Sequence, residues 1–179
     1  VQRSPAARRV QRALVRKLLR ELEGLAAETP DDYAVFWREF GPYIKEGVAT
    51  DPTAQSDLLP LLRFHSTEGD GALTSLAGYV ERMDDEQDAI YYVQGDDLSS
   101  VARSPHLDYF RAHDIEVLYL VEPVDSFMMG ALREYDGKRF KNVDDAGLEL
   151  PQEDESQDAQ EVIPEADFNR LVGRFVKTL

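Results

Sequence analysis

The chain has 179 residues, a formal net charge of −15 and no cysteine. The lack of cysteine excludes disulfides, thiolate metal ligands and cysteine nucleophiles, and it fits a reducing compartment. No apolar run is long enough to span a membrane, and the basic N-terminus lacks the apolar core of a secretory signal. We therefore expect a soluble, cytoplasmic protein with no membrane partner.

The charge is divided unevenly between the two ends of the chain. Residues 1–20 carry seven basic side chains and no acidic one, whereas residues 144–167 carry ten acidic side chains and no basic one. Four arginines of the first segment share one side of a helix, which is typical of a solvated face: Arg9, Arg12, Arg16 and Arg20. We do not expect nucleic-acid binding, because the remaining surface is strongly acidic and would repel phosphate.

Residues 1–59 show helical periodicity and predict a three-helix connector. Ser4-Pro5 opens a helix that should run to about Glu28, and Thr29-Pro30 opens a second one. Gly41-Pro42 should kink or break that second helix, and a third, short helix should run from Asp51-Pro52 to Pro60. Each helix has an apolar side, so the three should pack as a small bundle with Trp37 in its core. The apolar stripe of the first helix comprises Val10, Leu14, Leu18, Leu22 and Leu25.

Residues 60–143 alternate between strand and helix patterns in the order β-α-β-α-β-α-β. Such an order predicts an α/β fold, a small three-layer αβα sandwich with right-handed crossovers. We expect the strands at 61–64, 90–93, 115–121 and, as an edge strand, 139–143. Helices should run from Thr74 to Met83, over 98–101, after Ser104-Pro105 and from Val124.

Two further segments follow the sandwich. Residues 144–164 are acidic, contain proline and have almost no aromatic side chains, which predicts a flexible linker. A helix over residues 165–179 carries an apolar face that nothing after it covers. Because the first residue is valine rather than methionine, we expect the chain to be part of a longer protein, with this helix opening a C-terminal domain.

The carboxylates Asp96, Asp97 and Glu122 form the one candidate for a metal site. They follow two predicted strands, where α/β sheets bind ligands, and three carboxylates could hold Mg²⁺ for a metal-dependent enzyme. The competing interpretation is that these residues cap helices, as acidic residues after strands commonly do. The three histidines have no metal-motif spacing, and no Gly-rich phosphate loop occurs, so we expect neither a zinc site nor a phosphate cradle.

Phe127 lies off the apolar stripe of the helix that begins at Val124. That stripe comprises Val124, Met128, Leu132 and Tyr135, and Phe127 points about 100° away from it. Two interpretations remain open on physical grounds. Phe127 is either covered by the helical connector or, together with Met128 and Met129, exposed as a soft apolar surface that accepts many shapes.

Three colinear segments resemble the ninety-kilodalton heat-shock chaperone family, in particular its bacterial, HtpG-type branch. They are FWREFGPYIKEGVATD at 36–51, LLRFHSTEGDGALTSLAGYVERMDDEQDAIYYVQGDD at 61–97 and SPHLDYFRAHDIEVLYLVEPVDSFMMGALREYDGKRF at 104–140. The resemblance covers nearly the whole chain and corresponds to the later part of the family's middle domain. It implies a fragment of an ATP-dependent chaperone that binds partly folded client proteins and relays ATP-driven clamp closure.

The resemblance also assigns roles to individual residues. Gln2 matches the glutamine of the family's catalytic loop, whose arginine would precede this chain, so the fragment itself should not be an enzyme. ATP and Mg²⁺ would bind the family's N-terminal ATPase domain, and a C-terminal domain would form a homodimer. Phe127 occupies the place of an aromatic residue in the family's client-contacting surface, next to Ser126, Met128, Met129 and Gly130. Bacterial relatives often have an acidic residue at the position of Ser126 and asparagine at that of Gly130, which implies fewer polar client contacts here or contacts made elsewhere. The alternative to client binding is a purely structural spacer.

Overall fold

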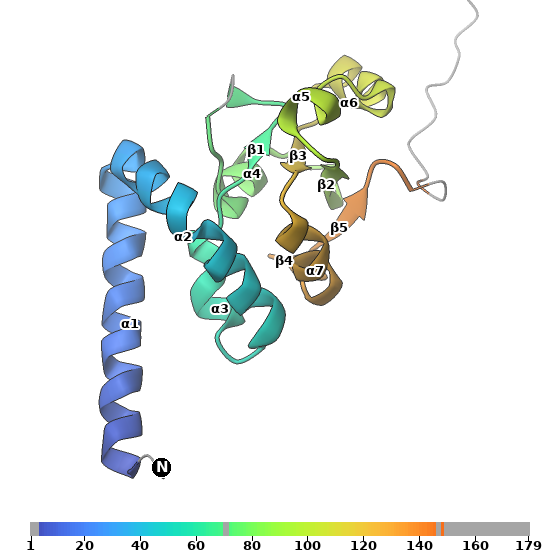
Figure 1. Ribbon diagram of the computed structural model, residues 1–179. Coiled ribbons are helices and arrows are strands. Elements are labelled where there is room, and N and C mark those ends of the chain that lie inside the picture. The colour runs from blue at the N-terminus through green and yellow to red at the C-terminus, as the bar shows by residue number, and fades with distance from the viewer. Residues whose placement is uncertain (1–3, 70–71, 146–147, 149–179) are drawn as a thin grey trace, which may run out of the picture. The chain divides into compact units, whose positions relative to one another are not determined.

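A computed structural model describes residues 4–69, 72–145 and 148 (Figure 1). The acidic linker predicted over 144–164 and the terminal helix predicted over 165–179 lie almost entirely outside these residues. Their predicted structure therefore stays a prediction.

Two long helices begin where the sequence predicts. Helix α1 (Pro5–Glu28) is capped by the Ser4 side chain, which accepts a hydrogen bond from the Ala7 backbone N–H at 3.2 Å. Helix α2 (Pro30–Thr50) continues through Pro42, so of the kink or break predicted at Gly41-Pro42 the break does not occur. The proline removes one backbone donor. The buried side chains on both sides of it, among them Trp37 and Val48, hold the helix together.

The third helix is shorter than predicted. The Asp51 carboxylate accepts hydrogen bonds from the Thr53 and Ala54 backbone N–H groups at 3.0 and 3.3 Å, which makes a turn there. Helix α3 (Gln55–Leu58) follows that turn, and Pro60 lies inside the 3₁₀ helix η1 (Leu59–Leu61) instead of ending the segment.

Among the described residues, helix α1 contacts the core only through its C-terminal half. Leu22 and Leu25 contact the core, whereas Val10, Leu14 and Leu18 are exposed. The predicted bundle is therefore incomplete. The apolar stripe exists, but no described element covers its first three residues.

The sheet has five strands in the order β1-β3-β2-β5-β4. Strand β2 (Ala89–Gln94) is parallel to β3 (Val117–Leu120) and to β5 (Lys138–Asn142), and both predicted interior strands are confirmed. The first strand, β1 (His65–Ser66), pairs antiparallel with β3 and lies after the predicted 61–64. Phe64 forms an isolated bridge with Thr74 instead of a strand.

The last strand is not an edge strand, contrary to the prediction. Strand β4 (Glu134–Tyr135) takes the edge and pairs antiparallel with β5. The two strands are joined by Asp136 and Gly137, whose φ angles are +50° and +74°. Positive φ at both central residues is the requirement of a two-residue type I′ hairpin, and Asp-Gly is one of its preferred sequences.

Helices cover both faces of this sheet, which confirms the three-layer αβα architecture. Figure 1 shows helix α7 (Pro123–Ala131) on one side of the sheet and α5 (Leu98–Val101) with α6 (Asp108–Ala112) on the other. The 3₁₀ helix η3 (Pro105–Leu107) leads into α6. The ring centroid of Phe110 on α6 lies 4.9 Å from that of Tyr91 on β2. Helix α4 (Leu76–Arg82) is capped by Ser75, one residue after the predicted cap Thr74.

The hydroxyl of Tyr79 links α4 to the sheet. It donates to the Glu116 carbonyl at 2.7 Å and accepts from the Tyr91 backbone N–H at 3.0 Å and from Gln87 Nε2 at 3.1 Å. Tyr79 is fully buried, so these three bonds satisfy a hydroxyl that water cannot reach.

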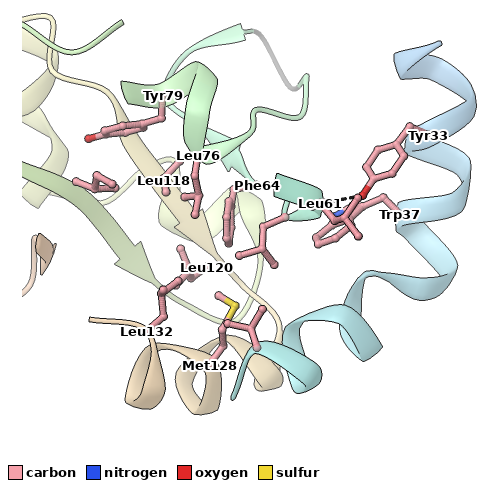
Figure 2. Close-up of a cluster of buried hydrophobic side chains, with 13 residues drawn as sticks. Tyr33, Trp37, Leu61, Phe64, Leu76, Tyr79, Leu118, Leu120, Met128 and Leu132 are labelled. Atoms are coloured by element: carbon pink, nitrogen blue, oxygen red, sulfur yellow. Dashed lines mark hydrogen bonds between the residues drawn. The ribbon is translucent and has the colours of Figure 1, made fainter. Parts of the chain in front are cut away.

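One core joins the helical connector to the sandwich (Figure 2). Tyr33, Trp37 and Leu61 from the connector belong to the same buried cluster as Leu118 and Met128 from the sandwich. The Tyr33 hydroxyl donates to the Leu61 carbonyl at 2.6 Å, and burial raises its pKa to about 12. Residues from both sides of the predicted boundary between 59 and 60 thus share one core, and η1 (Leu59–Leu61) crosses that boundary.

Candidate functional site

Phe127 is exposed on helix α7. Its side chain is 58% accessible, whereas Asp125 and Met128 on the same helix are buried. Successive residues of a helix differ by about 100° in direction, so a helix that points Asp125 and Met128 inward must point Phe127 outward. Of the two interpretations of Phe127, the structure supports the exposed one.

The two methionines beside Phe127 do not share its exposure. Met128 is fully buried, and Met129 is partly buried against the same core. The assignment of the Met128 side chain to an exposed surface is therefore wrong, because its place on the apolar stripe of α7 puts it in the core. Met129 contributes only the part of its side chain that the core leaves accessible.

Ser126 and Gly130 flank Phe127 on the exposed side of α7. Gln94 Nε2 donates a hydrogen bond to Ser126 Oγ at 3.1 Å, which ties this side of the helix to the end of β2. A Cβ atom added at Gly130 would meet no heavy atom within 4 Å, so the surface next to Phe127 is open. The exposed part of α7 thus consists of one large aromatic ring with small neighbours, a shape that suits contact with varied apolar groups.

The N-terminus of α7 is fixed by two carboxylates that form a capping box. The Asp125 side chain accepts from the Glu122 backbone N–H at 2.9 Å, and the Asp125 backbone N–H donates to the Glu122 carbonyl at 2.9 Å beside the Glu122 carboxylate. The pattern Glu122-Pro123-x-Asp125 resembles the known capping-box and N1-proline signals. It could have identified both carboxylates as helix caps from the sequence.

Lys45 of α2 contacts both capping carboxylates. Its Nζ atom lies 2.7 Å from Glu122 Oε2 and 2.7 Å from Asp125 Oδ1, and the lysine side chain is only 5% exposed. The contact with Asp125 Oδ1 is an ion pair without hydrogen-bond alignment, since that oxygen has no hydrogen-bond partner. Burial raises the pKa of Asp125, and the charge of Lys45 opposes this rise. Sequence reasoning did not identify Lys45.

The three carboxylates of the alternative metal site have structural roles or lie apart from one another. Asp97 caps α5 by accepting from the Ser99 and Ser100 backbone N–H groups at 2.8 and 3.0 Å, and Glu122 caps α7. Within residues 4–69, 72–145 and 148, no group of three His, Cys, Asp or Glu side chains is placed to hold a metal ion. The observed geometry matches the capping interpretation, and no observation favours a site that includes Asp96.

Gln2, the predicted loop glutamine, lies outside the described residues. None of the helices in the described part of the chain is both long and apolar enough to cross a membrane.

Comparison with known proteins assigns the chain to a family. The model of the family described as Hsp90 protein matches residues 1–179. The chain is 41% identical over 175 residues to the chaperone protein HtpG of Roseobacter denitrificans, covering 96% of this chain and 28% of that protein. It is 44% identical over 150 residues to HtpG of Paramagnetospirillum magneticum, covering 84% of this chain and 24% of that protein.

A solved structure gives the same assignment. The middle domain of a heat shock protein from Plasmodium falciparum superposes with a TM-score of 0.73 at 29% identity, over 81% of this chain and 61% of that one. The chain spans about a quarter of the length of the two HtpG relatives. These matches and the αβα fold lead to one conclusion: the chain belongs to the Hsp90 protein family, as an HtpG-type member that corresponds to part of the middle domain.

Proposed function

We propose that this chain binds partly folded client proteins through the exposed side of α7, with Phe127 as its central contact and Ser126, Met129 and Gly130 around it. The observation that carries the proposal is the exposure of Phe127 on a helix that buries Met128 and partly buries Met129. Partly folded proteins differ from folded ones by exposing apolar side chains, and an exposed aromatic ring is suited to contact them.

The size of this surface indicates weak and broad binding. One phenylalanine ring that becomes fully covered contributes roughly 1–2 kcal/mol, which by itself cannot give tight binding. Useful affinity would then require several such contacts acting together, because linked sites raise the effective concentration of one another.

In the parent protein we propose that this chain relays ATP-driven clamp closure. Its relatives are named HtpG chaperones, and in that family an N-terminal domain binds ATP with Mg²⁺ and a C-terminal domain forms the homodimer. Gln2 would then belong to the loop that completes the ATPase site, so the fragment would not be an enzyme by itself. A cytoplasmic location follows from the same proposal.

Client binding can be tested with the 179-residue chain. An NMR titration with a destabilised, partly unfolded test protein would be run on the wild type, on Phe127→Ala and on Tyr43→Ala. Tyr43 is a matched control, because it is an aromatic residue that is 69% exposed on α2. We expect shifts around Phe127 and Met129, a severalfold weaker affinity for Phe127→Ala, and little change for Tyr43→Ala.

Two outcomes would contradict the proposal. If the wild type shows no shifts, the chain is a structural spacer between other domains. If both alanine variants weaken binding equally, the chain binds through exposed aromatic rings in general and α7 has no special role.

A further inference from the structure

Lys45 occupies an unusual position for a lysine. It lies on α2 and is almost completely buried, with its Nζ atom 2.7 Å from each of two carboxylates on α7. Lysine is rarely buried unless its charge is paired. The ion pair therefore fixes a point of contact between α2 and the start of α7 through Lys45 and Glu122, which are 77 residues apart in the sequence.

The partners of Lys45 are the two residues that cap α7. Asp125 accepts the Glu122 backbone N–H at the start of that helix, and both residues place a carboxylate oxygen on Lys45. One lysine thus contacts both carboxylates of the capping box. A shift of Lys45 would disturb the first turn of α7 directly.

The ammonium group is also held by aromatic rings. It lies 5.7 Å from the ring centroid of Trp37 and 5.4 Å from that of Phe64, within the range of cation–π attraction. Both rings belong to the core that Figure 2 shows. The position of the charge is therefore fixed by rigid neighbours, so it can serve as a reference point for α7.

We propose that Lys45 is a positioning residue for the client surface, holding α7 so that Phe127 points outward; this inference rests on the proposed function. An apolar side chain at position 45 could keep the two helices together, since apolar replacements of buried ion pairs are often well tolerated. Such a contact has no preferred direction. The ion pair with Asp125 fixes the rotation of α7, and Phe127 follows Asp125 by two residues, or about 200° around the helix.

The test compares Lys45→Met with a stability control. Methionine keeps the unbranched apolar stem and removes the charge. Tyr79→Phe is the control, because it removes buried hydrogen bonds of α4 and leaves α7 untouched. Both variants would be measured for urea unfolding, for amide hydrogen exchange and for binding of the same partly unfolded test protein.

We expect Lys45→Met to speed amide exchange over residues 125–129 and to weaken client binding about tenfold, a factor that corresponds to about 1.4 kcal/mol. Tyr79→Phe should keep the wild-type affinity even if its free energy of unfolding is equal to or lower than that of Lys45→Met. The inference is overturned if the two variants lose affinity in proportion to their stability, or if exchange in α7 stays at the wild-type rate.

Two additional variants cover the remaining outcomes. If Lys45→Met does not fold, Asp125→Asn replaces it, because this variant keeps Lys45 paired with Glu122. It should also speed amide exchange in α7 and weaken client binding, but less than Lys45→Met. Unchanged exchange and binding in Asp125→Asn would overturn the inference. The triple variant Lys45→Met, Glu122→Gln and Asp125→Asn removes all three charges, so it should regain stability and still bind weakly. Restored binding in the triple variant would mean that stability alone matters.

Failure of the proposed function remains distinguishable from failure of this inference. If the wild type does not bind the test protein, the proposed function fails, and exchange in α7 still reports whether Lys45 fixes that helix. If Phe127→Ala weakens binding and Lys45→Met leaves it unchanged, the client surface stands and the role of Lys45 is wrong.

Discussion

Replacing a glycine by alanine should have opposite effects at two helical positions of this chain. In an ordinary helix the change stabilises by up to about 1 kcal/mol, because alanine loses less backbone entropy on folding. At Gly24 of α1 a Cβ atom would meet nothing within 4 Å, so Gly24→Ala should show this stabilisation.

At Gly41 of α2 the same change introduces a clash. An added Cβ would lie 2.8 Å from Trp37 Cε2 and 2.9 Å from Trp37 Cδ2, closer than real contacts allow. The ring cannot move away easily, since Trp37 is buried next to Tyr33 and Lys45. Overpacking of this kind costs about 1–3 kcal/mol. After a gain in helix propensity of about 1 kcal/mol is subtracted, Gly41→Ala should destabilise by up to roughly 2 kcal/mol.

Urea unfolding followed by tryptophan fluorescence measures both effects, because Trp37 is the only tryptophan in the chain. We expect the midpoint of Gly24→Ala to rise and that of Gly41→Ala to fall, each with an unchanged m-value. The melting temperature should move by about 2–4 °C for each kcal/mol. Stabilisation of both variants would refute the steric argument, since it would mean that the Trp37 ring adjusts without cost.

Two further predictions concern hydrogen bonds. Tyr79→Phe removes the three bonds of the Tyr79 hydroxyl and should destabilise the fold by roughly 2–4 kcal/mol, because the Glu116 carbonyl and the Tyr91 N–H each lose a buried partner, although Gln87 Nε2 keeps its bond to the Ala89 carbonyl. A loss below about 0.5 kcal/mol in urea unfolding would contradict this. The pKa of Asp97 is lowered in the folded state. The main cause is the hydrogen bond from the Ser99 hydroxyl, and backbone N–H groups of the same turn contribute less. Its contribution to stability is therefore present above the unfolded pKa and lost as the pH falls through the folded one, so Asp97→Ala should flatten the acid side of the stability curve. An unchanged slope of the urea midpoint against pH below about 5 would count against that role.

Features that depend on neighbouring residues were predictable from the sequence. The starts of α1 and α2 follow from Ser4-Pro5 and Thr29-Pro30, in which a proline takes the first helical position. The two interior strands follow from continuous apolar runs, which are typical of strands covered on both faces.

Features that depend on distant partners were not predictable in this way. Strands β1 and β4 have two residues each and exist because β3 and β5 offer free edges. Two residues are too few for any periodic pattern. The sequence also could not predict that Val10, Leu14 and Leu18 are exposed. An apolar stripe indicates that a helix packs against something, but it does not show which element covers it.

The candidate site also depends on a partner that is distant in the sequence. Knowing that partner, together with the apolar stripe of α7, is enough to deduce the direction of Phe127. Glu122 was a plausible metal ligand as long as its partner was unknown, and that partner, Lys45, lies on another helix. Once Lys45 is known to hold Asp125, and the apolar stripe is known to bury Met128, two directions of α7 are fixed about 60° apart on its inner side. Phe127 lies about 100° from one and 160° from the other, so it has to face outward. The exposure of the proposed client contact is thus a consequence of two buried interactions, and a change in either should alter the direction in which Phe127 points.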